Sequence, residues 1–95
     1  MTPRALIVDD EPDIRELLGI TLGRMQIQVS TAADYASAVK QLGSERFDLV
    51  LTDMRLPDGD GLDLVERIQS HRPGVPVAVI TAHGNVEAAV RALTL

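Results

Sequence analysis

Acidic side chains stand at two places where a short apolar run of the chain ends. Asp9 and Asp10 follow the run Leu6–Val8, and Asp53 follows Leu49–Thr52. If they converge, the carboxylates repel one another, because two unit charges about 4 Å apart cost roughly 4 kcal/mol at an intermediate effective dielectric. Such a cluster raises its pKa values or recruits a cation. A hard divalent ion that prefers oxygen ligands, above all Mg²⁺, resolves the conflict.

A carboxylate beside a divalent cation is suited to phosphoryl transfer. The cation offsets charge on the transferring group and holds it in line with the attacking oxygen. Thr81 ends another apolar run, and its hydroxyl would be placed to bond a phosphoryl oxygen. A competing interpretation is that these acids only stabilise the N-terminus of a helix. That interpretation suits Glu11 and Asp13 better than it suits the acids at the ends of the apolar runs. The combination of residues therefore predicts a phosphoryl-transfer site.

Apolar runs and amphipathic stretches alternate along the chain and must position these residues. Three runs, Ala5–Val8, Phe47–Leu51 and Val77–Ile80, are nearly continuous, as in parallel strands buried on both faces. The run Ile27–Thr31 alternates, which favours an edge strand. The apolar residues of the stretches between and after the runs recur every three or four positions, as in amphipathic helices: Ile14, Leu17, Leu18, Thr21, Leu22 and Met25; Tyr35, Ala38, Val39 and Leu42; Leu62, Val65 and Ile68; Val86, Ala89, Val90 and Leu93.

This alternation predicts an α/β fold, a doubly wound parallel sheet with helices on both faces. With the strand order 2-1-3-4, the first and third strands are neighbours where the strand order reverses. Ligands of open parallel sheets bind beyond the carboxyl ends of the strands at such a reversal. Asp9, Asp10 and Asp53 would then meet in one crevice.

Composition narrows the class of protein. The chain has 95 residues, which fits one domain, and 45% of them are hydrophobic, which favours folding. A formal net charge of -5 argues against direct nucleic-acid binding by this segment. It has no cysteine and no apolar run long enough for a membrane span. The start leads straight into a strand-like run, so we expect a cytoplasmic protein without a signal peptide.

Three ordered blocks of the sequence resemble response-regulator receiver domains. They are Leu6–Glu11, Asp48–Pro57 with the following Gly61, and Val79–His83. The resemblance runs over the whole chain, so residues 1–95 are expected to form one receiver domain with the flavodoxin-like fold. Within the family, the chain is similar to receivers of nitrogen-regulator-class activators, such as the regulator of type IV pilus genes.

The resemblance implies a role for each matching position. Asp53 would accept the phosphoryl group, and Asp10 would ligate Mg²⁺ directly with Asp9 assisting. The backbone carbonyl of Arg55 would be a further ligand, and Thr81 would be the switch hydroxyl. A sensor histidine kinase would donate the phosphoryl group. An output domain, with an ATPase module and a DNA-binding helix-turn-helix in the suspected class, would receive the signal. The receiver would not be a turnover enzyme, although it assists its own phosphorylation and dephosphorylation.

The chain departs from the family at its C-terminal end. Receivers have a fifth strand, bearing a Lys that pairs with the phosphoryl group, and then a fifth helix, and the sequence stops at Leu95 before both. Lys40, the only Lys, lies on the second helical stretch and cannot substitute. We therefore expect an incomplete receiver. We also expect self-association through an uncovered edge at Val77–Ile80, which has no charge and no internal Pro.

Two other classes of protein share this kind of fold. Haloacid-dehalogenase-like phosphatases carry Asp-x-Asp at the strand end, and Arg55 stands where the second Asp would act as acid and base. Flavodoxin-like FMN proteins have a Ser/Thr/Gly-rich phosphate loop after the first strand. The segment Asp9–Glu11 would instead repel a phosphate without a metal. A yellow colour would favour flavin, and sustained turnover of a phosphomonoester would favour the phosphatase.

Overall fold

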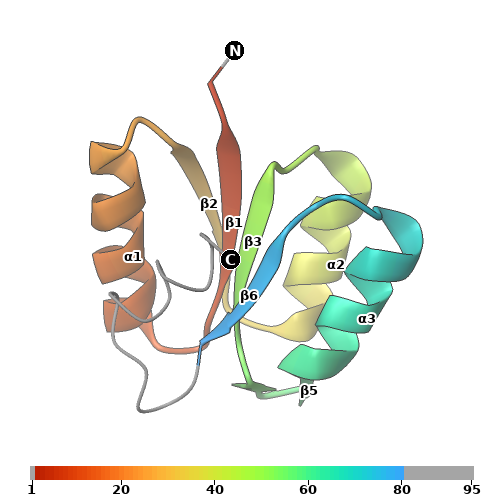
Figure 1. Cartoon of the computed structure of the whole chain (residues 1–95). Coiled ribbons are helices and arrows are strands. Elements are labelled where there is room, and N and C mark those ends of the chain that lie inside the picture. Colours follow the sequence, from red (N-terminus) through yellow and green to blue (C-terminus); the bar gives the residue numbers. More distant parts are fainter. Residues whose placement is uncertain (1, 81–95) are drawn as a thin grey trace.

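The computed structural model describes residues 2–80, which form a parallel sheet with helices on both faces (Figure 1). The strands of this sheet are β1 (Arg4–Val8), β2 (Gln28–Ala32), β3 (Leu49–Asp53) and β6 (Val77–Ile80). The helices between them are α1 (Pro12–Arg24), α2 (Tyr35–Ser44) and α3 (Gly61–His71). The strand order is β2-β1-β3-β6 and every pairing is parallel, which confirms the predicted order 2-1-3-4.

Alternate residues of the strands face opposite layers of the core. Ala5 and Ile7 of β1 pack with Leu18 and Leu22 of α1 on one face. On the other face, a second cluster lies under α2 and α3, and its buried members are Leu6, Val8, Ala32, Ala38, Phe47, Val50, Leu56, Leu64 and Ile68. Among the helices of residues 2–80, Figure 1 shows α1 on one side of the sheet and α2 and α3 on the other. The connections that leave β1 and β3 therefore run to opposite faces, so the strand order reverses between the carboxyl ends of these strands, where open parallel sheets bind ligands.

Local signals in the sequence explain where the helices begin. Pro12 opens α1, where its missing N–H costs nothing. The Asp34 carboxylate caps α2 by accepting the Ser37 N–H at 2.7 Å, and this hydrogen bonding to Ser37 lowers the pKa of Asp34. Asp60 caps α3 by accepting the Leu62 N–H at 2.8 Å. The caps of α2 and α3 fix the direction in which the chain leaves the carboxyl ends of the strands, which is the end of the sheet that carries the acidic residues.

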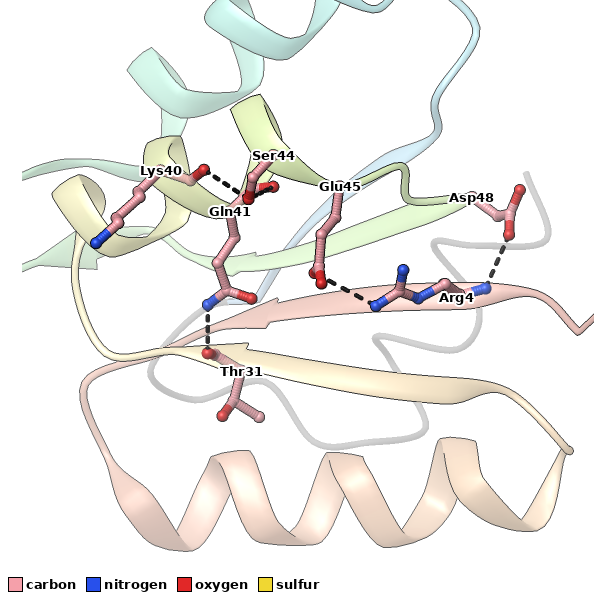
Figure 2. Close-up of polar contacts among 7 residues, drawn as sticks. All are labelled: Arg4, Thr31, Lys40, Gln41, Ser44, Glu45 and Asp48. Atoms are coloured by element: carbon pink, nitrogen blue, oxygen red, sulfur yellow. Dashed lines mark hydrogen bonds and ion pairs between the residues drawn. The ribbon is translucent and has the colours of Figure 1, made fainter.

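Contacts at the opposite end of the sheet tie β1 to α2 and to the start of β3 (Figure 2). The Arg4 N–H donates to the Asp48 carboxylate at 2.8 Å, and the Arg4 guanidinium lies 3.3 Å from the Glu45 carboxylate. Nearer the carboxyl ends of the strands, Gln41 of α2 donates its side-chain N–H to the carbonyl of Thr31 in β2 at 2.7 Å. The side chains of Arg4 and Glu45 are 36% and 40% exposed, so their ion pair contributes little stability on its own.

The structure corrects the predicted helix faces and adds an element. Leu17 and Met25 were assigned to the buried stripe of α1, yet 48% and 54% of their surfaces are exposed. In addition, β4 (Arg55–Leu56) and β5 (Gly59–Asp60) form a short antiparallel hairpin between β3 and α3.

Several predictions fall outside the described residues. They concern Thr81, His83 and the fourth amphipathic stretch, Val86–Leu93. Within residues 2–80, β6 pairs with β3 and stands at the margin of the sheet. Self-association through β6 therefore remains a prediction. Among the same residues, no helix combines the length and the apolar character needed to cross a bilayer.

Candidate functional site

The register of β1 and β3 brings together acids that are far apart in the sequence. Val8 pairs with Thr52, so Asp9 and Asp53 follow side by side. Asp10 continues the turn that leads into α1. One oxygen atom from each of the three carboxylates lies within 4.8 Å of the others. The predicted convergence of Asp9, Asp10 and Asp53 is therefore confirmed, at the carboxyl ends of β1 and β3.

The three carboxylates differ in their exposure to solvent. Asp9 is buried, with 4% of its surface exposed, Asp53 is half-buried, and Asp10 is exposed. Burial raises the pKa of Asp9, and the negative charges of Asp53, Asp10 and Glu11 raise it further. The Glu11 N–H donates to the Asp9 carboxylate at 2.8 Å and opposes part of that rise. The folded protein thus keeps a buried carboxylate in a position unfavourable for an anion.

Backbone contacts hold Asp9 in this position. Its N–H donates to the carbonyl of Ala32 in β2 at 3.0 Å, which extends the pairing of the strands by one residue. The Arg15 guanidinium of α1 donates to the Asp9 carbonyl at 2.8 Å. Sequence reasoning did not single out Arg15. The only available signal was an Arg one turn into the helix that follows the acidic pair.

Asp53 is fixed through its own carbonyl and the residues on either side of it. The buried Thr52 hydroxyl donates to the Asp53 carbonyl at 3.0 Å. The Met54 N–H donates to the carbonyl of Ile80 in β6 at 3.1 Å, and the Gly61 N–H donates to the Met54 carbonyl at 2.8 Å. A Cβ atom built on Gly61 would overlap the Asp53 carbonyl oxygen. Only glycine allows the start of α3 to approach the strand end so closely.

The remaining predicted site residues are placed as follows. Arg55 lies in β4, opposite Asp60 of β5, and is exposed. Its role as a carbonyl ligand stays a prediction. Thr81 follows Ile80, the residue of β6 that pairs with Asp53, and lies outside the described residues.

The donor set fits a hard divalent cation. It offers carboxylate oxygens from two neighbouring strand ends, and one of them belongs to a buried acid whose pKa is raised. A bound cation would compensate the repulsion that the fold builds into this site, and Mg²⁺ prefers such oxygen ligands. The half-buried carboxylate of Asp53 remains open enough for a second reactant.

The Asp9 carboxylate gives a first testable prediction. Asp9→Asn keeps an oxygen that can accept the Glu11 N–H but removes the buried charge, so it should raise the melting temperature in EDTA by roughly a few degrees at neutral pH. Because the pKa of Asp9 is raised in the folded state, the parent loses stability as pH rises from below the ordinary value of 3.8 through the raised value. The stabilisation by asparagine should therefore vanish in acid.

Thermal melts across a pH series, with EDTA and then with saturating Mg²⁺, measure this effect. Mg²⁺ should remove or reverse the difference, because the parent then uses the charge as a ligand. An Asp9→Asn protein that is less stable than the parent at neutral pH in EDTA would contradict the electrostatic account.

An open parallel α/β sheet with three acids at its switch point defines a class of phosphoryl-transfer domain, and the comparisons with known proteins agree. The profile of the response regulator receiver domain matches residues 5–95. The chain belongs to this family. It is 60% identical over 90 residues to the response regulator protein PilR of Pseudomonas aeruginosa, covering 95% of this chain and 20% of that protein.

Other relatives extend the similarity. The chain is 41% identical over 87 residues to the transcriptional regulatory protein GlrR of Escherichia coli, covering 92% of this chain and 20% of the relative. The response regulator TrrA of Thermotoga maritima, solved in complex with Mg²⁺ and beryllium fluoride, superposes with a TM-score of 0.80 at 32% identity. That similarity covers 95% of this chain and 80% of TrrA. The chain thus spans about one fifth of the length of PilR and of GlrR.

Proposed function

We propose that this receiver domain is a phosphorylation switch whose acceptor is Asp53, with a sensor histidine kinase as donor and Mg²⁺ as cofactor. The observation that carries the proposal is the meeting of Asp53 with Asp9 and Asp10 at the carboxyl ends of β1 and β3. The relatives GlrR and PilR are named as regulators. Their names support an output domain that controls transcription in the full-length protein.

The transfer step follows from the chemistry of a carboxylate. An oxygen of Asp53 attacks the phosphorus of a phosphohistidine, and a new P–O bond forms as the P–N bond breaks. The electron pair of that bond stays on the imidazole nitrogen. The product is an acyl phosphate, which water later hydrolyses to inorganic phosphate and the free carboxylate. Each cycle needs a new donor, so the domain acts as a switch that assists its own phosphorylation and dephosphorylation.

Asp10, Asp9, Asp53 and the main-chain carbonyl of Arg55 are the groups that would hold the cation. Its chemical contribution is to offset the charge of the phosphoryl oxygens. Asp10 is exposed and can turn towards a hydrated ion, whereas Asp9 is buried and held by the Glu11 N–H. The complex of TrrA with Mg²⁺ and beryllium fluoride supports this assignment.

The phosphoryl group would switch the domain through Thr81. It carries about two negative charges and three acceptor oxygens, and it replaces the single negative charge of the Asp53 carboxylate. Thr81 follows Ile80, the residue of β6 that pairs with Asp53 in the neighbouring strand. We propose that its hydroxyl would bond a phosphoryl oxygen on Asp53. A new hydrogen bond there would bias the chain after β6 between two states.

The chemistry of the phosphorylated product tests the proposal. The full-length protein is incubated with Mg²⁺ and acetyl phosphate, and in parallel with a phosphorylated histidine kinase. The modified residue is mapped by mass spectrometry. We expect a phosphoryl adduct on the peptide that contains Asp53, removed by hydroxylamine as an acyl phosphate is. An adduct on a hydroxyl side chain, or sustained release of phosphate from many phosphomonoesters, would contradict the proposal.

Magnesium affinity gives the next prediction. Asp10→Asn should weaken Mg²⁺ binding by about 10–100-fold, and more than Asp9→Asn does. Within residues 2–80 no N–H donates to the Asp10 carboxylate, whereas the Glu11 N–H donates to that of Asp9. The family pattern likewise makes Asp10 the direct ligand and Asp9 the assisting one. Isothermal titration of both variants and the parent measures the difference, and the affinity should fall on acidification, because the ligands must be ionised. Unchanged affinity in Asp10→Asn would refute the assignment.

A further inference from the structure

The hairpin β4–β5 follows the proposed phosphoacceptor directly and is anchored at its base and its middle. At the base, the Gly61 N–H donates to the Met54 carbonyl at 2.8 Å. In the middle, the side chain of Leu56 is 9% exposed and belongs to the core cluster beneath α2 and α3. The hairpin therefore moves with the strand end that carries Asp53, unless its tip is fixed to something else.

Asp58 fixes the tip to another element. One of its carboxylate oxygens accepts the Tyr35 N–H at 2.7 Å, and the other accepts the Ala36 N–H at 3.1 Å. These two groups open helix α2, more than 20 residues earlier in the chain. Free N–H groups at the start of a helix favour a negative partner. A carboxylate that accepts two N–H groups, one on each oxygen, is held in a single orientation. An acceptor with one oxygen could rotate about its single hydrogen bond.

A second contact between the same elements keeps Asp58 in register. A Cβ atom built on Gly59 would lie 2.9 Å from Cδ2 of the Tyr35 ring, so the ring rests directly on the hairpin backbone. Helix α2 itself starts from β2, whose last residue, Ala32, accepts the N–H of Asp9. The tip of the hairpin and the acidic end of β1 are thus tied to the same segment of chain.

We propose that Asp58 is a positioning residue for the phosphoacceptor site, which keeps the hairpin and the carbonyl of Arg55 in place for Mg²⁺ by binding the start of α2. The inference rests on the proposed function, because it assumes that the Arg55 carbonyl is a ligand. Asp58 itself lies at the tip, opposite the base that joins the site, and acts through the backbone of β4. Its loss should reduce affinity for the cation and leave the chemistry of Asp53 intact once the cation is bound.

Three variants of the full-length protein separate this role from a general effect of charge. Asp58→Ala removes both acceptors, and Asp58→Asn keeps one. Asp63→Asn is the matched control, because Asp63 is another exposed acid near the start of a helix and accepts no hydrogen bond from a different element in residues 2–80. For each protein, the Mg²⁺ dependence of Asp53 labelling by acetyl phosphate is measured below its melting temperature, and Mg²⁺ affinity is measured directly.

We expect Asp58→Ala to raise the half-saturating Mg²⁺ concentration about tenfold, as outer-shell substitutions do, while the rate at saturating Mg²⁺ stays within about twofold of the parent. The half-saturating Mg²⁺ concentration of Asp58→Asn should lie between those of Asp58→Ala and the parent. If the alanine variant does not fold, the asparagine variant alone tests the inference. If both Asp58 variants have the same half-saturating Mg²⁺ concentration as Asp63→Asn, this inference is wrong, but the proposed function still stands. A parent that is not labelled on Asp53 would overturn the proposed function and this inference with it.

Discussion

Asparagine in place of Asp53 is expected to abolish formation of the acyl phosphate. The amide has nearly the shape of the carboxylate, but it carries no charge and offers no nucleophilic oxygen to phosphorus. The side chain is half-buried and one of three converging acids, so removing its charge relieves repulsion on Asp9 and should not unfold the domain. Labelling by acetyl phosphate should fall to background, and activation of the full-length protein by its kinase should be lost.

Asp13→Asn is the control for this substitution. Asp13 is an exposed acid in the first turn of α1. The variant therefore loses one negative charge near the same end of the sheet and leaves the three converging acids unchanged. It should label at the rate of the parent, and both proteins should give the same circular dichroism spectrum. An Asp53→Asn protein that labels as well as Asp13→Asn would remove Asp53 from the mechanism.

Alanine in place of Gly61 is expected to cost about 3 kcal/mol of folding free energy and to impair phosphorylation as well. The new Cβ would meet the Asp53 carbonyl oxygen, a backbone atom that cannot rotate away as a side chain would. Overpacking of this kind costs about 1–3 kcal/mol or more. The gain in helix propensity on replacing glycine is at most about 1 kcal/mol, so the clash decides the sign. To relieve it, the strand end would have to move and carry Asp53 with it.

Gly43→Ala provides the matched control, because a Cβ there meets nothing within 4 Å. Gly43 lies in the last turn of α2, where alanine should stabilise by about 0.5–1 kcal/mol. Urea unfolding of both variants and the parent should therefore shift the midpoint in opposite directions. If Gly61→Ala is as stable as the parent, the start of α3 can move away from the Asp53 carbonyl without loss of folding free energy, and the prediction is wrong.

The sequence predicted the sheet well because its central strands have no wet face. The runs at β1 and β3 are nearly continuous, so their burial and parallel pairing did not depend on knowing which side each residue faces. The faces of α1 were harder to predict. Leu17 and Leu18 are equally apolar, yet only Leu18 reaches the sheet. Which of two adjacent leucines is buried depends on how the helix is rotated on the sheet, and periodicity alone leaves that rotation open by about one residue.

The acids of the site could be found from the sequence, whereas their supports could not. Asp9 and Asp53 stand at strand ends, and parallel pairing of neighbouring strands is enough to bring them together. Arg15, Thr52 and Asp58 act through hydrogen bonds between their side chains and backbone atoms of other residues. A hydrogen bond from a side chain to a backbone group leaves no pattern of residue types at both ends, because any residue can supply the backbone group. Such contacts become visible only in three dimensions.

The contact between Tyr35 and Gly59 makes the protein its own optical reporter. The chain contains one Tyr and no Trp, so Tyr35 dominates its near-ultraviolet absorption and emission. The ring rests on the hairpin that follows Asp53, and the tip of that hairpin binds the Tyr35 N–H. A shift of the hairpin when Asp53 gains a phosphoryl group would change the surroundings of this single chromophore. Tyrosine emission and near-ultraviolet circular dichroism can therefore follow the switch in the unlabelled chain.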